Sequence, residues 1–257
     1  MHKIAFQLGG LDIHWYGILV AIGFMVGLWT ASRRGLRDGL NPESIIDLGP
    51  WLVIGSLLGA RALYVISNWE DYYANHPLWE VFMIRQGGLV FYGGLMGATI
   101  ASLFYLHWKK LPLWKTADAL APSIALGYVF GRVGCLMYGC CYGRPTQMPW
   151  GIRFPADHET AGTAVHPTQL YESLLNAGLY AVLAWGYRRK QFDGQIFAAY
   201  LISYAVLRFI DEFFRGDYQT FYLGNWATPA QLLSLLVFLV GAGLWWQLSG
   251  KRPEPGA

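Results

Sequence analysis

The chain of 257 residues is 54% hydrophobic and only 14% charged, and it contains 12 Trp and 16 Tyr. Soluble domains carry about 25% charged residues, so this composition excludes an ordinary soluble domain and predicts an integral membrane protein. The formal net charge of +3 is too small to indicate a nucleic-acid-binding protein.

Seven apolar stretches follow one another along the chain, each about as long as a bilayer-spanning helix. We expect helices at residues 15–32, 46–67, 89–107, 118–137, 168–187, 195–214 and 228–248. No internal repeat and no linker long enough for a second domain accompanies them. The sequence therefore predicts an all-α integral membrane protein with seven transmembrane helices, forming a single membrane-embedded domain over residues 1–257.

Lysine and arginine are distributed unequally between the two sides of these predicted spans. Of the 19 Lys and Arg, 11 lie on one side, 5 on the other and 3 within the spans. The positive-inside rule then places the N-terminus outside and the C-terminus in the cytoplasm. The two longest connections, at about residues 68–88 and 138–167, fall on the outer side. Residues 1–14 do not resemble a cleavable signal peptide, so we expect the first span to act as an uncleaved insertion signal.

Three arginines, Arg61, Arg132 and Arg208, lie inside predicted spans. A central arginine costs roughly 2.5–3.5 kcal/mol on insertion scales, and such charges usually face a bundle interior or a wet cavity. A guanidinium keeps its proton, so each needs a carboxylate, phosphate or carbonyl partner. The sequence predicts a polar, cationic chamber within the helices.

The sixth predicted span contributes several polar side chains to one helix face. Their spacing of i, i+4, i+8 and i+11 places them on the same side of the helix. They are Tyr204, Arg208, Glu212 and Arg215.

Several motifs, in this order along the chain, are similar to those of the bacterial prolipoprotein diacylglyceryl transferases. The most specific is the segment GRVGCLMYGCCYG at residues 131–143. The others are HWYG at 14–17, GAR at 59–61, GGLVFYGG at 87–94, DALAP at 118–122, HPTQLYE at 166–172 and the polar face at 204–215. Together they cover most of the chain.

The resemblance implies an enzyme that transfers an sn-1,2-diacylglyceryl group from phosphatidylglycerol to the lipobox cysteine thiol of a prolipoprotein. A thioether forms and glycerol 1-phosphate leaves, without a cofactor or metal. The nucleophile belongs to the acceptor, so the enzyme need supply only thiol activation and positive donors for the departing phosphate. The implied location is the bacterial cytoplasmic membrane, with the active chamber towards the outer side.

The family motifs also indicate which residues to expect at the site. Guanidinium forks suit phosphate oxygens, Glu212 can hold an arginine in place, and tyrosine hydroxyls can bond phosphate or glycerol. The expected catalytic residues are Tyr16, Tyr92, Arg132, Arg208 and Glu212. The expected phospholipid-headgroup ligands are His14, Arg61, Gly93, Gly94, Arg132, Gly143, His166, Tyr204, Arg208 and Arg215.

Structural explanations compete with several of these assignments. The glycines suit close helix packing, and the motif beginning at His166 resembles a helix start, with Glu172 one turn inside. Asp118 is better explained as a helix-terminal carboxylate than as a ligand.

Two departures from the family pattern concern the chemistry. Many relatives have a histidine, proposed as the base, where this chain has Tyr92. A phenol is a poor base near neutral pH, so we expect Tyr92 to donate a hydrogen bond or position substrate, and the base stays unassigned. The signature also carries Cys135, Cys140 and Cys141 where many relatives have other residues.

The cysteines favour a structural disulfide or buried thiols on the outer side of the membrane. A bond between adjacent Cys140 and Cys141 would be strained, so Cys135 paired with either is the better disulfide. We expect no metal site, because neither a C-x-x-C motif nor a spaced histidine accompanies them. A membrane thiol-disulfide oxidoreductase using the three cysteines is the alternative function, and a non-catalytic lipid-binding or transport relative is a third.

Overall fold

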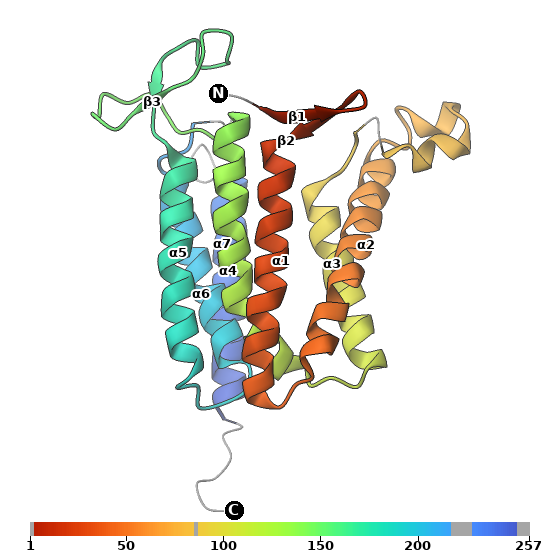
Figure 1. The fold of residues 1–257 in the computed structure, drawn as a ribbon, viewed down its shortest axis with the longest axis vertical. Coiled ribbons are helices and arrows are strands. Elements are labelled where there is room, and N and C mark those ends of the chain that lie inside the picture. The colour runs from red at the N-terminus through yellow and green to blue at the C-terminus, as the bar shows by residue number, and fades with distance from the viewer. Residues whose placement is uncertain (1–2, 85–86, 217–227, 251–257) are drawn as a thin grey trace, which may run out of the picture. The chain divides into compact units, whose positions relative to one another are not determined.

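The computed structural model describes residues 3–84, 87–216 and 228–250, and long helices dominate this part of the chain (Figure 1). The long helices are α1 (Trp15–Gly35), α2 (Pro42–Ser67), α3 (Phe91–Trp108), α4 (Leu113–Tyr138), α5 (Thr168–Tyr187), α6 (Gln195–Asp211) and α7 (Pro229–Ser249). Among the described residues, short 3-10 helices lie in the connections at Leu36–Asp38, Tyr73–Asn75 and Leu78–Phe82.

The predicted positions of the helices are confirmed, with the ends displaced by a few residues. The largest displacement is in α4, which begins at Leu113, five residues before the predicted start at residue 118. Within the described parts of the chain, four helical segments are long and apolar enough to cross a membrane: Trp15–Asp38, Pro42–Ser67, Leu113–Tyr138 and Pro229–Ser249. The mostly helical membrane fold is therefore supported, whereas the seven-span topology stays a prediction.

Local sequence explains where individual helices begin. Helix α7 starts with a capping box, in which Thr228 Oγ1 accepts from Gln231 N at 3.3 Å and Gln231 Oε1 accepts from Thr228 N at 3.1 Å. Pro229 occupies the first turn, where its missing N–H costs nothing. Thr228, Pro229 and Gln231 thus set the start of α7.

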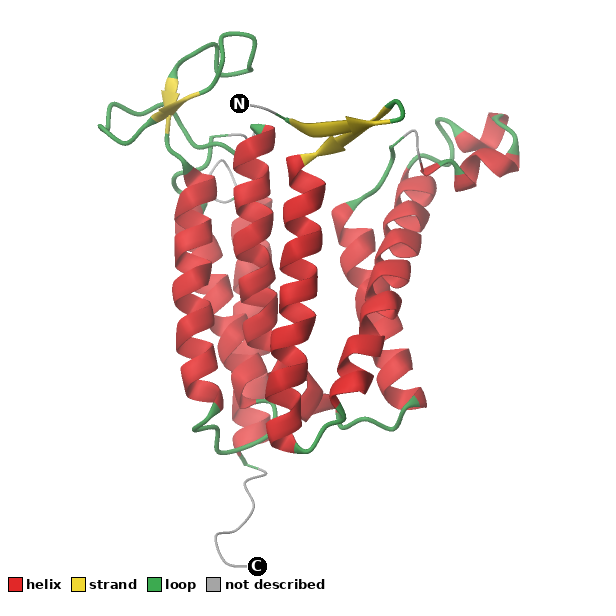
Figure 2. Ribbon diagram, viewed as in Figure 1, coloured by secondary structure: helices red, strands yellow, loops and turns green. Residues whose placement is uncertain are grey.

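The prediction of an all-α chain is wrong in one respect, because two small antiparallel sheets are present (Figure 2). The first pairs β1 (Ile4–Leu8) with β2 (Leu11–His14), and the second pairs β3 (Ile152–Arg153) with β4 (Ala164–Val165). Gly9 and Gly10 turn the first hairpin with φ of 54° and 83°. A Gly-Gly pair between two short strand-forming segments is typical of a β-hairpin, but a prediction based on the length of apolar stretches does not detect it.

The helices group into two compact units, and each is described by itself. The large unit comprises residues 1–31 and 117–257, and the small unit comprises residues 32–116. The organisation as one functional domain stays a prediction.

In the large unit, α6 packs against α5 and α7, and α4 contacts both α1 and α5. Helices α1 and α4 approach closely at Gly23, where a Cβ atom would lie 2.8 Å from Phe130 Cβ. The hydroxyls of Thr30 and Ser123 join the same two helices at 2.9 Å. Ser173 Oγ donates to Val129 O across the contact between α5 and α4 at 3.3 Å.

Asp118 fixes the N-terminus of α6 within the large unit. Its Oδ1 accepts from Ile196 N at 2.9 Å and Phe197 N at 3.0 Å, and its Oδ2 accepts from Gly194 N at 2.8 Å. Lys190 Nζ lies 3.2 Å from the same carboxylate, whose side chain is fully buried. Three otherwise unpaired N–H groups at a helix start are satisfied in this way, which agrees with the structural role expected for Asp118.

In the small unit, α2 and α3 pack through glycines. A Cβ atom at Gly59 would lie 2.3 Å from Gly93 O, and one at Gly97 would lie 2.1 Å from Gly55 O. Backbones that approach this closely leave room for no side chain, as in small-residue contacts between membrane helices. The glycines at these positions therefore set the distance between the two helices.

Large apolar side chains point outward from the long helices. Phe91 on α3, Leu174 on α5 and Trp246 on α7 are 77%, 72% and 82% exposed. Apolar surface on this scale is unusual for a soluble monomer and suits contact with lipid.

Candidate active site

A cluster of three arginines and three carboxylates lies inside the large unit, where α4, α5 and the C-terminal end of α6 meet. The side chains are at most 12% exposed where they form ion pairs. Equal numbers of each charge allow these groups to be buried together. The members are Arg132, Glu172, Arg208, Asp211, Glu212 and Arg215.

Arg132 is bound by one end of its guanidinium only. Its Nη2 lies 2.8 Å from Glu172 Oε2 and also donates to the hydroxyl of Tyr128, which in turn donates to Glu172. Tyr128 and Arg132 are four residues apart on α4, so both face α5. The Nε and Nη1 groups of Arg132 meet no acceptor in the part of the chain that the structure describes. These donors are available to a ligand.

Arg208 is held by its own helix turn. Its Nη1 lies 2.6 Å from Glu212 Oε2 and 3.7 Å from Asp211 Oδ2. Arg215, just beyond α6, lies 3.7 Å from Glu172 Oε1. Glu172 therefore links an arginine of α4 with an arginine at the end of α6, a role larger than that of the helix-start residue expected from its motif.

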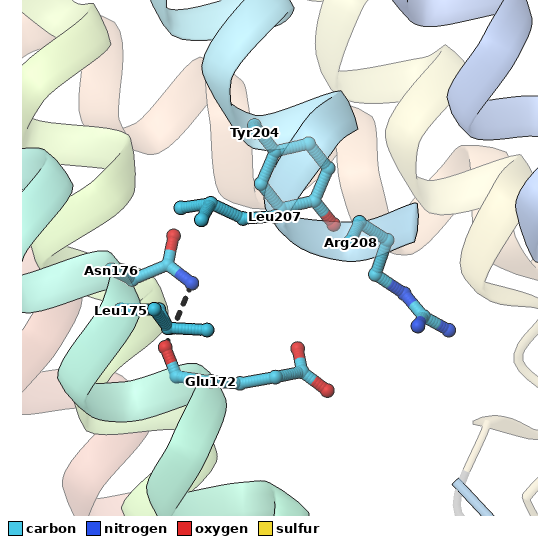
Figure 3. Close-up of a pocket in the computed structure, with 6 residues that line it drawn as sticks. All are labelled: Glu172, Leu175, Asn176, Tyr204, Leu207 and Arg208. Carbon is cyan, nitrogen blue, oxygen red and sulfur yellow. Dashed lines mark hydrogen bonds between the residues drawn. The ribbon is translucent and has the colours of Figure 1, made fainter. Parts of the chain in front are cut away.

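A small cavity adjoins this cluster (Figure 3). Its volume is about 10 Å³, roughly the room that one water molecule needs. It is lined by Glu172, Leu175, Asn176, Tyr204, Leu207 and Arg208. Figure 3 shows Glu172 and Arg208 reaching towards it from different helices, α5 and α6. Tyr204 stacks on Tyr200 and meets Tyr128 edge-on, with ring centroids 5.7 Å apart in both pairs.

Several buried acceptor oxygens in the charged cluster and beside it have no hydrogen-bond donor among the described residues. They are Glu172 Oε1, Asn176 Oδ1, both carboxylate oxygens of Asp211 and Glu212 Oε1. An unsatisfied buried acceptor costs about 1–3 kcal/mol. The cluster thus combines free guanidinium donors with acceptors that a ligand hydroxyl can satisfy.

The three cysteines form a second cluster directly after α4. All three are free, half-buried thiols, and their Sγ atoms lie within 4.8 Å of one another. Of the two expected alternatives, a disulfide from Cys135 or buried thiols, this structure has the thiols, since none of the three cysteines is bonded to another. Cys140 Sγ and Cys141 Sγ are 3.8 Å apart. The pKa of the Cys141 thiol lies below its ordinary value because Cys135 and Cys140 hydrogen-bond to it, and Arg132 and Arg215 add to the effect.

His14 and Tyr16 lie in a larger pocket of the large unit rather than in the arginine cluster. The pocket has a volume of about 640 Å³, and Asp12, Tyr138 and the first turn of α1 complete its lining. Tyr16 is also within electrostatic reach of Arg132 and of all three cysteine thiols. This tyrosine therefore connects the pocket with both clusters.

Gly143 and His166 shape the loop beside Arg215 and do not enter the arginine cluster. Gly143 N donates to His166 O at 2.9 Å, and a Cβ at Gly143 would lie 2.6 Å from His166 Cβ. Gly143 also forms a β-bridge with Arg215. His166 Nδ1 lies 3.1 Å from the hydroxyl of Tyr171. Both residues position the backbone from which Arg215 extends.

Arg61 and Tyr92 belong to the small unit. The guanidinium of Arg61 donates to four carbonyl oxygens, those of Val81 at 2.6 Å, Glu80 at 2.8 Å, Gly87 at 3.0 Å and Gly88 at 3.3 Å. Four of its five N–H groups are thereby satisfied, which favours a structural clamp on this connection over headgroup binding.

The other predicted site residues of the small unit are at the start of α3. Tyr92 is half-exposed in the first turn of α3 and its ring meets Phe91 edge-on. Gly93 faces Gly59, and a Cβ at Gly94 would lie 3.0 Å from Ser56 Oγ, so both glycines serve helix packing.

Tyr128, Asn176 and Asp211 were not among the predicted site residues. Tyr128 could have been found, because it precedes Arg132 by four residues and so shares its helix face. Asn176 and Asp211 could not, since their importance comes from the buried, unpaired oxygens that only the packed helices create.

Comparison with known proteins shows which family the chain resembles. Residues 3–247 match the family model described as prolipoprotein diacylglyceryl transferase. The chain is 38% identical over 242 residues to the phosphatidylglycerol–prolipoprotein diacylglyceryl transferase of Finegoldia magna, covering 94% of this chain and 93% of that protein. It is 35% identical over 256 residues to the enzyme of that name from Thermosynechococcus vestitus, covering 97% and 94%. The corresponding Bordetella parapertussis protein is 36% identical over 248 residues, covering 94% and 93%.

Proposed function

This chain belongs to the prolipoprotein diacylglyceryl transferase family, and we propose that it transfers an sn-1,2-diacylglyceryl group from phosphatidylglycerol to the lipobox cysteine thiol of a prolipoprotein. The observation that carries this proposal beyond the family name is the guanidinium of Arg132. It is fixed at one end by Glu172 and Tyr128 while Nε and Nη1 meet no acceptor in the described chain.

The open side of Arg132 suits a phosphodiester. The Nε–H and Nη1–H groups of Arg132 can each donate to an anionic phosphate oxygen, from two different edges of the guanidinium, while Nη2 stays bonded to Glu172 and Tyr128. As the carbon–oxygen bond breaks, the leaving phosphate gains negative charge, and a preorganised cation nearby stabilises that change most strongly. Arg208 and Arg215 add positive charge around Glu172, and their carboxylate partners keep them in position.

The glycerol headgroup fits the remaining polar atoms. Its hydroxyls can donate to the unpaired oxygens of Asn176, Asp211 and Glu212. A headgroup that brings hydroxyl donors removes the cost of these buried acceptors, whereas a headgroup without them leaves it in place. This complementarity supports phosphatidylglycerol as the donor lipid.

The acceptor thiol would enter through the pocket at His14 and Tyr16. A volume of about 640 Å³ lies within the range of small-ligand sites, and Tyr16 packs against the helix just before Cys135, because a Cβ atom at Gly134 would lie 3.1 Å from Tyr16 Cδ2. The acceptor sulfur attacks the glyceryl carbon, the carbon–oxygen bond breaks, and glycerol 1-phosphate departs. The acceptor thiol releases its proton to solvent before its sulfur attacks.

The surrounding topology belongs to the same proposal. Seven spans, an outer N-terminus and a cytoplasmic C-terminus place the site towards the outer face of the bacterial cytoplasmic membrane, since the ends of α4 and α6 and the start of α5 then face outward. The apolar helices and the family support a membrane-embedded enzyme. The thiol-disulfide oxidoreductase alternative has no support from the relatives.

The direct test incubates the purified protein with phosphatidylglycerol and a lipobox peptide and measures the peptide mass. A mass gain of one diacylglyceryl group, absent when serine replaces the peptide cysteine, is the expected result. Phosphatidylethanolamine serves as the headgroup control and should give little product. No mass gain from an enzyme with intact helical content would contradict the proposal.

A further inference from the structure

The thiol cluster is not explained by phosphate binding. Cys135 lies in the last turn of α4, while Cys140 and Cys141 follow the helix end. The chain reverses at Gly139, where φ is 90°, and this reversal carries the two later sulfurs back towards Cys135. All three Sγ atoms then lie within 4.8 Å of one another. Residues that are separate along the helix end become one group of sulfur atoms.

The backbone of this segment is held in an unusual conformation. Cys141 has φ of 62°, in the left-handed region that a residue with a side chain rarely adopts. Its carbonyl accepts from Thr168 Oγ1 at 2.7 Å, and the carbonyl of Cys140 accepts from Gln169 Nε2 at 2.7 Å. Two buried side chains at the start of α5 thus fix both cysteines in the arrangement that gathers the sulfurs.

The spacing of the sulfurs fits a metal ion. Thiolates at about 2.3 Å from a tetrahedral Zn²⁺ lie roughly 3.8 Å apart. The Sγ atoms of Cys140 and Cys141 are separated by 3.8 Å, and the remaining separations exceed that value by at most 1 Å. Soft thiolate ligands favour Zn²⁺ or Cu⁺ over hard cations. The absence of a C-x-x-C motif argued against a metal in the sequence, but the turn at Gly139 removes that objection.

The group supplies three ligands, and no fourth Cys, His, Asp or Glu joins it among the described residues. Three protein ligands with one open position are typical of catalytic rather than structural zinc sites. The open position would face a small molecule or an acceptor group. Tyr16, on the wall of the pocket of about 640 Å³, lies 3.1 Å (Cδ2) from the place that a Cβ atom at Gly134, the residue before Cys135, would take.

We propose that Cys135, Cys140 and Cys141 bind one thiophilic divalent cation of the Zn²⁺ class, and that its fourth position takes the acceptor cysteine thiol. The second half of this statement rests on the proposed transferase function. Metal coordination is an established way to activate a nucleophile, and here it supplies the thiol activation for which Tyr92 is poorly suited.

The step balances without a further reactant. The acceptor thiol releases its proton to solvent when its sulfur binds the cation. That sulfur then forms a bond to the glyceryl carbon, the carbon–oxygen bond to phosphate breaks, and its electron pair leaves with glycerol 1-phosphate. The thioether product is a weaker ligand than the thiolate and dissociates from the cation.

The test of the site uses the whole protein in detergent and the metal alone. Protein stripped of metal is titrated with Zn²⁺ and, separately, with Co²⁺, whose thiolate charge-transfer absorption reports sulfur ligands. We expect one metal per chain, with binding at least about 100-fold weaker in Cys140→Ser and Cys141→Ser. His107→Ala, a change in α3 that removes no proposed ligand, should bind as the unmodified protein does. Protein of the natural sequence whose thiols have been capped by alkylation should also lose the site. This sample controls for misfolding of the cysteine-to-serine variants.

The acceptor half is tested without lipid, so that no transfer is needed. A lipobox peptide added to the Co²⁺ protein should increase the charge-transfer absorption, and the same peptide with serine in place of cysteine should not. Binding no tighter than in the alkylated protein would overturn the metal site. Equal spectra with both peptides would overturn the acceptor assignment. Failure of the transfer assay alongside a cysteine-dependent spectrum would reject the proposed function and leave the metal site standing.

Discussion

Arg132 and Glu172 form an ion pair of 2.8 Å between α4 and α5, and Tyr128 bonds both partners. Glu172 also lies 3.7 Å from Arg215. A single carboxylate therefore sets the distance between guanidiniums from two parts of the chain. Because each guanidinium is fixed before a ligand arrives, little reorganisation is needed when phosphate binds.

Replacing Tyr128 by phenylalanine removes the hydroxyl that joins Arg132 to Glu172 and leaves the ring in place. A hydrogen bond to a charged group contributes about 1.5–3 kcal/mol, so we expect transfer to slow by roughly 10- to 100-fold. Tyr200→Phe is the matched control, because the Tyr200 hydroxyl bonds no described residue. Initial rates of peptide lipidation measure the effect. Equal rates for the two variants would show that the Tyr128 hydroxyl has no part in catalysis.

Asp118→Asn should lower stability without changing the activity of the folded enzyme. The change weakens three backbone hydrogen bonds and a buried ion pair with Lys190, at a cost of about 2–4 kcal/mol. Asp193→Asn is the control, since Asp193 contacts the same lysine at 3.4 Å from a 45% exposed position. Thermal unfolding in detergent should separate the variants clearly. Identical unfolding temperatures would mean that Asp118 does not hold the start of α6.

Gly97→Ala should disrupt the packing of α2 on α3. The added Cβ would lie 2.1 Å from Gly55 O and 2.8 Å from Gly59 Cα, and backbone atoms cannot move aside as a side chain can. Such overpacking costs about 1–3 kcal/mol or more. Gly243→Ala on α7 meets no atom within 4 Å and should be neutral or slightly stabilising. Comparison of their yields and unfolding temperatures checks the prediction, which is refuted by a Gly97 variant as stable as the control.

The sequence predicted the long helices well because length and apolar character determine them almost locally. The helix that begins at Thr168 and ends at Tyr187 has the predicted bounds. The hairpin at Gly9 and Gly10 was not predicted, because its two strands are much shorter than the apolar stretches from which the helices were predicted. In these cases the information was present in neighbouring residues.

The site was less predictable, because its geometry depends on contacts between distant segments. Arg61 was expected at the headgroup, yet carbonyls about 20–27 residues later in the chain satisfy it. Cys135, Cys140 and Cys141 suggested a disulfide or buried thiols, and the positive φ at Gly139 and Cys141 gathers the sulfurs without bonding them. Neither outcome follows from residue spacing.

The most direct test of the account is the rate of diacylglyceryl transfer by Arg132→Lys, measured over a range of phosphatidylglycerol concentrations beside Arg153→Lys, a change at an exposed arginine of β3. An ammonium keeps the charge but cannot bond Glu172 and at the same time present fixed donors at the Nε and Nη1 positions. We predict that kcat/KM falls at least about 100-fold in the Arg132 variant and stays near the unmodified value in the control. Equal kcat/KM in both variants, with folding intact, would contradict phosphate recognition by the Arg132 guanidinium.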